Sequence, residues 1–326
     1  MTTSREYPYS NGTLYGVESD AARHAMAGYF LLVFTSSVIG DTTILIASIK
    51  YKAFKLHKLI ISVIQHIALC DLLVTFTDVL PKIVSLFSNG WMFGNFLCDL
   101  APYTKYYLAG TSILLICCMT TSKLLLLKHP LRFGVTSAGK GNVICAACWM
   151  TAATLPLSAF LVAVWNGQDI YFSYRTYYCD YGFSSDIWHW LKPLIAVVFM
   201  FIPNCVVVAT TIYLLVIAER VARRGRESLK WQGIMTTVLT ATVYCISVLP
   251  YAVYRVGESI VTDHSAKNFF HTSFFRVAAW FLYLNTMSNF YIYSLSVHSF
   301  RGFIWSGVQR AFRMLGPCAG SSAFRG

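Results

Sequence analysis

The chain has 326 residues, of which 56% are hydrophobic and only 12% are charged, and its formal net charge is +12. Soluble domains carry roughly 25% charged residues, so this composition excludes an ordinary water-soluble domain. The apolar residues gather into stretches of about 20 or more, which is the length that crosses a hydrocarbon core about 30 Å thick. A protein embedded in a membrane is therefore expected.

Seven such stretches follow one another along the chain, and together they predict an all-α bundle of seven transmembrane helices. The expected domain organisation is a tail over residues 1–24, the bundle over 25–297 and a final segment over 298–326. The seven expected spans are residues 25–49, 59–85, 98–127, 143–165, 189–218, 232–256 and 273–297.

The basic residues are concentrated in alternate connecting segments, which explains the positive charge without nucleic acid as a partner. Lysine and arginine are frequent in residues 50–58, 123–140 and 220–230 and in the segment after 298. By the positive-inside rule these regions are cytoplasmic. The expected location is the plasma membrane, crossed several times, with the amino terminus outside and the carboxyl terminus in the cytoplasm.

The outer segments carry two kinds of covalent site. Asn11-Gly12-Thr13 in the amino-terminal tail is a glycosylation acceptor, in agreement with an extracellular position for Asn11. Cys98 opens the third span at its outer end, and Cys179 lies in the outer loop before the fifth span. Both positions are oxidising, and a disulfide between these two cysteines is the natural pairing.

Six aromatic residues surround Cys179 in this outer loop. One interpretation is a lid or a peptide-binding surface over the bundle. Aromatic residues are also enriched in the belts at membrane interfaces, and this second interpretation is favoured. The residues are Tyr171, Phe172, Tyr174, Tyr177, Tyr178 and Tyr181.

The carboxyl-terminal segment has a helical pattern of its own. Apolar residues recur at helical spacing over residues 300–315, opposite Arg310 and Arg313. This pattern predicts a short amphipathic helix on the inner membrane face. Cys318 lies just beyond it and is a candidate for palmitoylation.

Several short motifs occur together in the order and spacing of a known family. They are Leu69-Cys70-Asp71-Leu72-Leu73, Trp91-Met92-Phe93-Gly94, Trp149, Pro203, Pro250 and Asn289-Phe290-Tyr291-Ile292-Tyr293. Taken together, these motifs resemble the rhodopsin-like family of G-protein-coupled receptors over roughly residues 25–315.

The resemblance implies a receptor that passes the signal of an extracellular ligand to a heterotrimeric G protein. Arrestin is a further expected partner, and no cofactor is required. By their positions in the family pattern, Lys123, Lys230 and Tyr293 are expected to contact the G protein. The basic residues of 220–230 also suit binding to anionic membrane lipid.

Three departures from the family pattern affect the expected switching machinery. Ser122-Lys123-Leu124 stands where the family has Asp-Arg-Tyr, Val248 stands at the sixth-span tryptophan, and Phe290 replaces the seventh-span proline. Lysine is a point charge and cannot reproduce the planar, forked hydrogen bonding of arginine. The usual ionic latch of the inactive state is therefore not expected. A receptor-like protein that binds ligand without activating a G protein is an alternative.

Asp71 is an acid near the middle of the membrane, a costly position that marks function by default. The resemblance places Ser112, Asn285 and Asn289 around it and implies a sodium ion there. Asp41 replaces the usual first-span asparagine, and two neighbouring carboxylates either share a proton or hold a cation more firmly. The alternative is a polar network that only packs the helices.

Lys105 lies two turns into the third span, on the face that also carries Ser112, and it is expected to point into the bundle. The resemblance places an aspartate here in receptors for biogenic amines, so a lysine favours an anionic ligand group. The alternative is an internal ion pair with Asp78, because buried lysines generally find a partner. The other expected ligand-binding residues are Tyr106, Tyr251, Arg255, Trp280 and Tyr283.

Three other classes of function are disfavoured. An enzyme is not expected, because no nucleophile, base and orienting acid occur together and no phosphate-binding glycine loop is present. A retinal-binding light receptor needs a Schiff-base lysine, and no lysine follows Lys267. A transporter is suggested by the intramembrane charges, but internal repeats and broken helices, which transporters often have, are not evident. These charges are Asp41, Asp71, Asp78 and Lys105.

Overall fold

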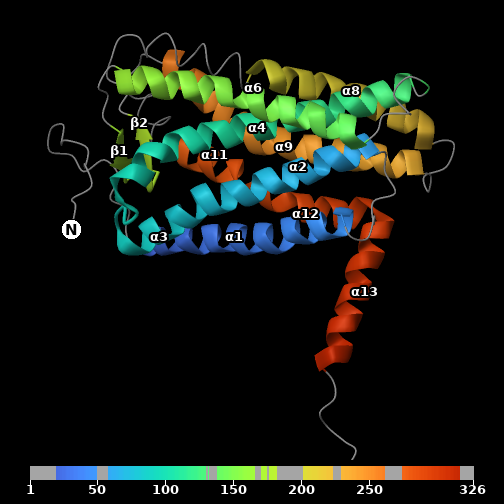
Figure 1. Cartoon of the computed structure of the whole chain (residues 1–326), viewed down its shortest axis with the longest axis horizontal. Helices are drawn as coiled ribbons and strands as arrows, with labels where there is room; N and C mark the ends of the chain where they lie inside the picture. The colour runs from blue at the N-terminus through green and yellow to red at the C-terminus, as the bar shows by residue number, and fades with distance from the viewer. Residues whose placement is uncertain are drawn as a thin grey trace, which may run out of the picture.

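The fold is described by a computed structural model of the chain. Long helices run side by side, and a short β-hairpin lies at one end of the molecule (Figure 1). The structure describes residues 20–49, 58–129, 131, 138–165, 170–174, 176–181, 201–222, 229–260 and 274–315.

Helices make up nearly all of the described chain. The strands of the hairpin are β1 (Ile170–Ser173) and β2 (Tyr178–Tyr181), and η1 (Thr75–Val79) is a π-helix. The α-helices are α1 (Asp20–Ile49), α2 (Lys58–Val74), α3 (Leu80–Ser88), α4 (Gly94–Lys128), α6 (Ala138–Trp165), α8 (Ile202–Ala222), α9 (Leu229–Ile260), α11 (Phe275–Leu282), α12 (Leu284–Ser296) and α13 (His298–Leu315).

Six stretches of the described chain are long and apolar enough to cross a membrane. They lie in α1, in α2 continued through η1 and α3, and in α4, α6, α8 and α9. The seventh expected span corresponds to α11 and α12, which are separated only by Tyr283. The prediction of an all-α transmembrane bundle is confirmed. The carboxyl-terminal pattern forms α13, which leaves the bundle at a steep angle (Figure 1).

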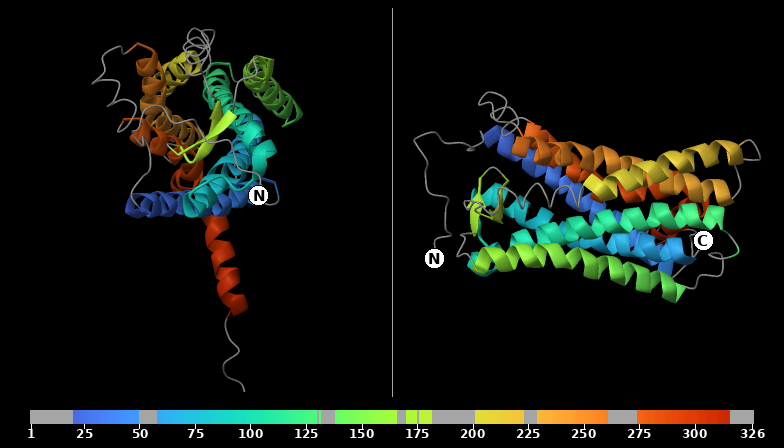
Figure 2. Two further views of the ribbon diagram at one scale, coloured as in Figure 1. Left: turned by 90° about the vertical axis from the view of Figure 1, so that its left-hand side faces the viewer. Right: turned by 90° about the horizontal axis from the view of Figure 1, so that it is seen from above.

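The helix α4 has the most central place in the bundle, where it contacts α2, α6, α8 and α9. On either side of it, α1 packs against α2 and α12, and α9 packs against α8, α11 and α12. In the view along the helices, the hairpin crosses the middle of one end (Figure 2, left). This end also carries the bond between Cys98 and Cys179, and we call it the disulfide end.

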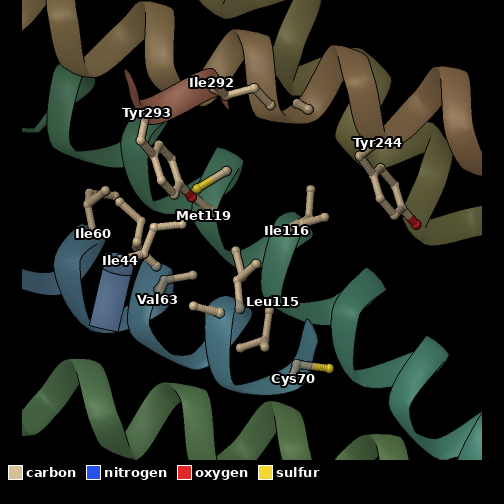
Figure 3. Close-up of a cluster of buried hydrophobic side chains, with 14 of the residues drawn as sticks. Ile44, Ile60, Val63, Cys70, Leu115, Ile116, Met119, Tyr244, Ile292 and Tyr293 are labelled. Carbon is tan, nitrogen blue, oxygen red and sulfur yellow. The ribbon is translucent and has the colours of Figure 1, made fainter. Parts of the chain in front are cut away.

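A large cluster of buried apolar side chains joins α1, α2, α4, α9 and α12 (Figure 3). Ile44, Val63 and Leu115 in this cluster have no exposed surface. Large apolar residues also lie on the outer faces of the helices, where Ile39 and Met150 are well exposed. An apolar surface of this kind marks contact with lipid.

The second span is interrupted near its middle. Its regular α-helix ends at Val74, and the π-helix η1 follows before α3 resumes the span at Leu80. Pro81 lies in the first turn of α3. Because proline lacks an amide hydrogen and its ring crowds the carbonyl four residues earlier, here that of Thr77, it disturbs the helix at this point.

The seventh span is interrupted at Tyr283. The amide of this residue donates to the Trp280 carbonyl, three residues earlier, at 3.2 Å, which is the tighter 3₁₀ pattern. The helical path therefore tightens at this one residue before α12 begins. The length of an apolar stretch predicts a span but not these two interruptions. Each interruption depends on which groups the local backbone and side chains hydrogen bond with.

Gly40 of α1 packs closely against Phe290 of α12. A Cβ atom at Gly40 would lie 2.6 Å from the Phe290 Cβ atom and 3.2 Å from its Cγ atom. Contacts this short require something to move. The close approach of α1 and α12 therefore depends on a residue without a side chain at position 40.

Gly40→Ala is expected to lower the free energy of unfolding by about 1–3 kcal/mol, the usual cost of adding a methyl group to a well-packed core. Thermal unfolding of the purified protein in detergent measures the loss. Gly28→Ala is the matched control on the same helix, because nothing lies within 4 Å of a Cβ atom at that position. Equal destabilisation by both substitutions would contradict the close contact with Phe290.

Candidate functional site

The disulfide between Cys98 and Cys179 attaches the hairpin to the bundle. Cys98 lies in α4 and Cys179 in β2, and their Cα atoms are 5.3 Å apart. The predicted disulfide is thus present in the structure. The two strands are antiparallel, with Phe172 opposite Cys179, and β2 contacts both α3 and α4.

The aromatic residues of the hairpin form a small core of their own. Phe172, Tyr177 and Tyr178 are buried, and Trp91 packs edge-on against Tyr178 with ring centroids 5.7 Å apart. The Trp91 indole donates to the Gly94 carbonyl at 2.9 Å, which fixes the turn before α4. The favoured interpretation of an interfacial belt is wrong for these three hairpin residues, because the disulfide draws them inward against the bundle.

Tyr178 joins the hairpin to the interrupted second span. Its hydroxyl donates to the Thr77 carbonyl at 2.7 Å. In a regular α-helix this carbonyl would accept a hydrogen bond from the amide of residue 81, which Pro81 lacks. Burial raises the pKa of Tyr178, so the hydroxyl stays protonated and able to donate.

An ion pair lies beside this contact, deep in the disulfide end. The Lys82 ammonium contacts the Asp78 carboxylate and the Tyr283 hydroxyl, and that hydroxyl donates to the second Asp78 oxygen at 2.6 Å. The side chains of Lys82 and Asp78 are only 5% and 7% exposed. A buried ion pair is tolerated when further hydrogen bonds satisfy its charges, and Tyr283 supplies them here.

A second ion pair lies nearer to solvent. The Lys105 ammonium is 3.5 Å from one carboxylate oxygen of Asp180, and the Tyr106 hydroxyl is 3.4 Å from the other. The side chains of Lys105 and Asp180 are 14% and 17% exposed. The prediction that Lys105 points into the bundle therefore agrees with its position, and its direct partner comes from the hairpin.

The alternative that paired Lys105 with Asp78 is wrong. Asp78 is bound instead by Lys82, four residues further along the same span and on the same face. Asp180 reaches Lys105 because it directly follows Cys179 in β2, and the disulfide holds that strand against α4.

The ring of Tyr178 lies close to both lysines. Its centroid is 4.6 Å from the Lys82 ammonium and 5.9 Å from the Lys105 ammonium, both within the range of cation–π attraction. Asp78 and Asp180 balance the two positive charges. These five side chains, from α3, η1, α4 and β2, form what we call the charge network, to which Tyr106 and Tyr283 are hydrogen bonded.

The other predicted ligand residues extend beyond the charge network. Tyr251 packs in an apolar cluster with Tyr254 and Ala278 and is also within electrostatic range of Lys105. The ring of Trp280 stacks on Tyr29 of α1 with centroids 5.4 Å apart, and the Tyr29 hydroxyl donates to the Trp280 carbonyl at 2.6 Å. Arg255 lies in α9, and its side chain is outside the described part of the structure.

The polar residues predicted around Asp71 lie near the middle of the bundle. The Asn289 amide donates to Asp71 at 2.6 Å, and the Ser37 hydroxyl donates to Asp41 at 2.6 Å. Asn285 is buried and Ser112 half-buried.

Two carbonyl oxygens in this region lack a hydrogen bond. The side-chain oxygens of Asn285 and Asn289 are buried without a partner among the described residues. Buried polar atoms are usually satisfied, and oxygen atoms of this kind are the ligands that hard cations prefer. The residues present are therefore chemically suited to a sodium ion.

The residues predicted to contact a G protein lie toward the opposite end of the bundle. Lys123 is buried, and it forms no ion pair with any residue that the structure describes. Tyr293 is buried and its ring is directed between helices, beside Met119 (Figure 3). Lys230 lies in α9 with its side chain outside the described part, and Asn11 and Cys318 lie outside the described residues altogether.

Sequence reasoning missed Lys82, Asp180 and the inward position of Tyr178. Lys82 had a usable signal, since residues 59–85 contain no other lysine or arginine and Lys82 follows Asp78 by one helical turn. Asp180 had a weaker signal in its position next to Cys179. Tyr178 had the same weak signal, since it is the tyrosine of the loop directly next to Cys179.

Breaking the buried pair from one side should be costly. Lys82→Met leaves the Asp78 charge unpaired and is expected to lower the free energy of unfolding by about 3–5 kcal/mol. The double variant with Asp78→Asn removes both charges and should recover most of the loss. Thermal unfolding in detergent of the native chain, both single variants and the double variant measures the coupling.

Asp20→Asn is the control for this cycle, because it breaks the surface pair with Arg23, in which the Asp20 side chain is 83% exposed. Its effect should stay below about 1 kcal/mol. Simple addition of the two losses in the Asp78/Lys82 double variant would show that the pair is not coupled.

Comparison with known proteins gives the relationship of the whole bundle. The family model described as 7 transmembrane receptor (rhodopsin family) matches residues 41–293. The chain is 26% identical to octopamine receptor beta-2R of Chilo suppressalis over 170 residues, which are 49% of this chain and 42% of that receptor.

It is also 29% identical over 133 residues, 40% of this chain, to C-X-C chemokine receptor type 1 of Macaca mulatta and of Homo sapiens, covering 36% and 37% of those proteins. The chain thus spans less than half the length of these relatives. The family match, by contrast, runs from Asp41 in the first span to Tyr293 in the seventh. The chain is a multi-pass membrane protein that belongs to the rhodopsin family of seven-transmembrane receptors.

Proposed function

We propose that this chain is a plasma-membrane receptor that transmits the binding of an extracellular ligand to a heterotrimeric G protein. The observation that carries the proposal is the family match over residues 41–293, which includes most of the bundle. The disulfide end is extracellular in this proposal, because α2 begins at Lys58 and α4 ends at Lys128 at the opposite end of the bundle, where basic residues are retained in the cytoplasm (Figure 1).

Further expected features follow from this orientation. Asn11 lies outside and is available for glycosylation, whereas Cys318 lies in the cytoplasm and is available for palmitoylation. The basic residues of 220–230 bind anionic lipid as well as the G protein, and arrestin is a further partner.

The charge network is the proposed ligand site. The names of the relatives refer to octopamine and to C-X-C chemokines, which are ligands of different kinds, so the ligand class is assigned from the residues of this chain. Lys105 is the accessible cation of the network, with Tyr106 and Tyr178 beside it. A ligand with an anionic group fits this arrangement, since a cationic ligand would be repelled by Lys105.

A sodium ion between Asp71 and the neighbouring oxygens is proposed to stabilise the resting bundle. The oxygens of Asn285 and Asn289, which have no partner among the described residues, support it. Asp41 is within electrostatic range of Asp71, and Ser112 is the remaining predicted ligand. A second acid at position 41 strengthens the attraction for a cation. No other cofactor is proposed.

Sodium chloride should raise the melting temperature of the native protein relative to N-methylglucamine chloride at equal ionic strength. At a sodium concentration ten times the dissociation constant, the expected gain is about 1.4 kcal/mol. Asp71→Asn should abolish the difference between the two salts, whereas Asp99→Asn, an exposed acid at the disulfide end, should leave it unchanged. The same salt difference in the native protein and Asp71→Asn would rule out this sodium site.

The proposed mechanism of signalling is a population shift between two arrangements of the bundle. A ligand at the disulfide end favours the arrangement in which the ends of α8 and α9 nearest the connecting segment 223–228 move apart, which exposes a surface for the G protein. Lys123 and Tyr293, both buried in the present arrangement, are the residues expected to be uncovered.

The lysine at position 123 and the valine at position 248 favour a second candidate, a receptor that binds without activating a G protein.

Basal nucleotide exchange on a G protein, measured in membranes with equal amounts of receptor at the surface, tests these two functions. Lys123→Ala is expected to lose the basal signal of the native chain, because it removes the charge that contacts the G protein. Lys128→Ala, which removes an exposed charge from the same end of α4, should retain it. A silent native chain with a signal in Lys123→Arg would favour the binding-only receptor, and equal signals in the native chain and Lys123→Ala would contradict the role of Lys123.

A further inference from the structure

The two ion pairs of the charge network differ in how firmly they are held. Asp78 and Lys82 are the more deeply buried pair, and Tyr283 completes their hydrogen bonding. The Lys105–Asp180 contact is 3.5 Å long and its side chains are partly exposed to solvent. Charge-assisted hydrogen bonds are usually about 2.7–2.9 Å long, so the second pair is loosely made. Lys105 is therefore the cation whose partner can be exchanged.

Asp180 stands where an anionic ligand group would bind. Its carboxylate lies against the Lys105 ammonium and the Tyr106 hydroxyl, which are the two donors that such a group would use. The adjacent Cys179 is bonded to Cys98, so the strand returns this carboxylate to the same place at a high effective concentration.

We propose that Asp180 is a tethered internal ligand of Lys105, and that an external carboxylate binds by replacing it. The inference rests on the proposed ligand site and adds the mode of binding. Exchange of one carboxylate for another keeps the charge of the network balanced, and the partly exposed Asp180 side chain moves into water. A neutral or cationic ligand would leave one of these charges without its partner, which costs free energy in a partly buried site.

The surroundings of Lys105 define the ligand class further. The centroids of the Tyr106 and Tyr178 rings lie 5.6 Å and 5.9 Å from its ammonium, so a ligand group bound to Lys105 lies near two aromatic rings. Aromatic rings attract one another in stacked and edge-on arrangements. An aromatic carboxylate is therefore the proposed class of ligand.

Removal of the internal competitor should strengthen binding of an external carboxylate. If Asp180 occupies Lys105 in nine molecules of ten, its loss raises the apparent affinity about tenfold, because the competent fraction rises from about one tenth to one. Asp180→Asn removes the negative charge and keeps the size of the side chain. Asp99→Asn removes an exposed acid from the same end of the bundle and is the matched control.

The test uses the purified full chain in detergent, with benzoate as the probe and benzamide as its uncharged counterpart. Melting temperatures are measured over a range of probe concentrations for the native chain, Asp180→Asn, Asp99→Asn and the double variant Asp180→Asn/Lys105→Ala. Benzoate is expected to stabilise Asp180→Asn at about tenfold lower concentration than the native chain or Asp99→Asn. Benzamide should not distinguish the proteins, and the double variant should lose the response to benzoate.

Three results would overturn the inference: equal benzoate responses in the native chain and Asp180→Asn, a response that survives Lys105→Ala, and no response in any protein. If Asp180→Asn does not show a cooperative unfolding transition, Asp180→Ser takes its place in the same comparison. Nucleotide exchange is measured separately. A benzoate response of the expected pattern without G-protein activation would support the internal ligand and reject the proposed coupling. G-protein activation without that benzoate pattern would support the coupling and reject the internal ligand.

Discussion

Two lysines and two aspartates lie inside the disulfide end of the bundle, where each charge needs a partner because the surroundings solvate it poorly. The Asp78–Lys82 pair meets this requirement within one span and is completed by Tyr283 from another. The Lys105–Asp180 pair meets it between a span and the hairpin. At this end of the bundle, the four charges are satisfied together once the disulfide has placed the hairpin against α4.

The interruptions of the second and seventh spans belong to the same arrangement. Because Pro81 has no amide hydrogen, the Thr77 carbonyl lacks its usual donor, and it accepts a hydrogen bond from the Tyr178 hydroxyl of the hairpin instead. Tyr283, at the interruption of the seventh span, brings its hydroxyl to Asp78 and Lys82. The hairpin, the second span and the seventh span are consequently linked through a few neighbouring side chains.

The middle of the bundle combines tight packing with incomplete hydrogen bonding. Gly40 allows Phe290 to approach α1, and Asn289, the residue before Phe290, donates to Asp71. The buried side-chain oxygens of Asn285 and Asn289 remain without a hydrogen-bond donor in the described chain. A region that packs closely but leaves these oxygens unsatisfied is suited to a bound cation, and it lies between the proposed ligand site and Lys123.

The sequence by itself determined the membrane bundle, the family and the Cys98–Cys179 disulfide, because apolar length, motif spacing and the position of a cysteine are local properties of the chain. The motifs that contain Asp71 and Asn289 also predicted that these two residues lie together, and the structure shows the hydrogen bond between them. Only the tertiary structure decided that Lys105 pairs with Asp180, that Tyr283 completes the Asp78–Lys82 pair, and that Trp280 stacks on Tyr29. These pairings depend on the rotation of each helix and on where the disulfide places the hairpin, and neither quantity can be read from one segment alone.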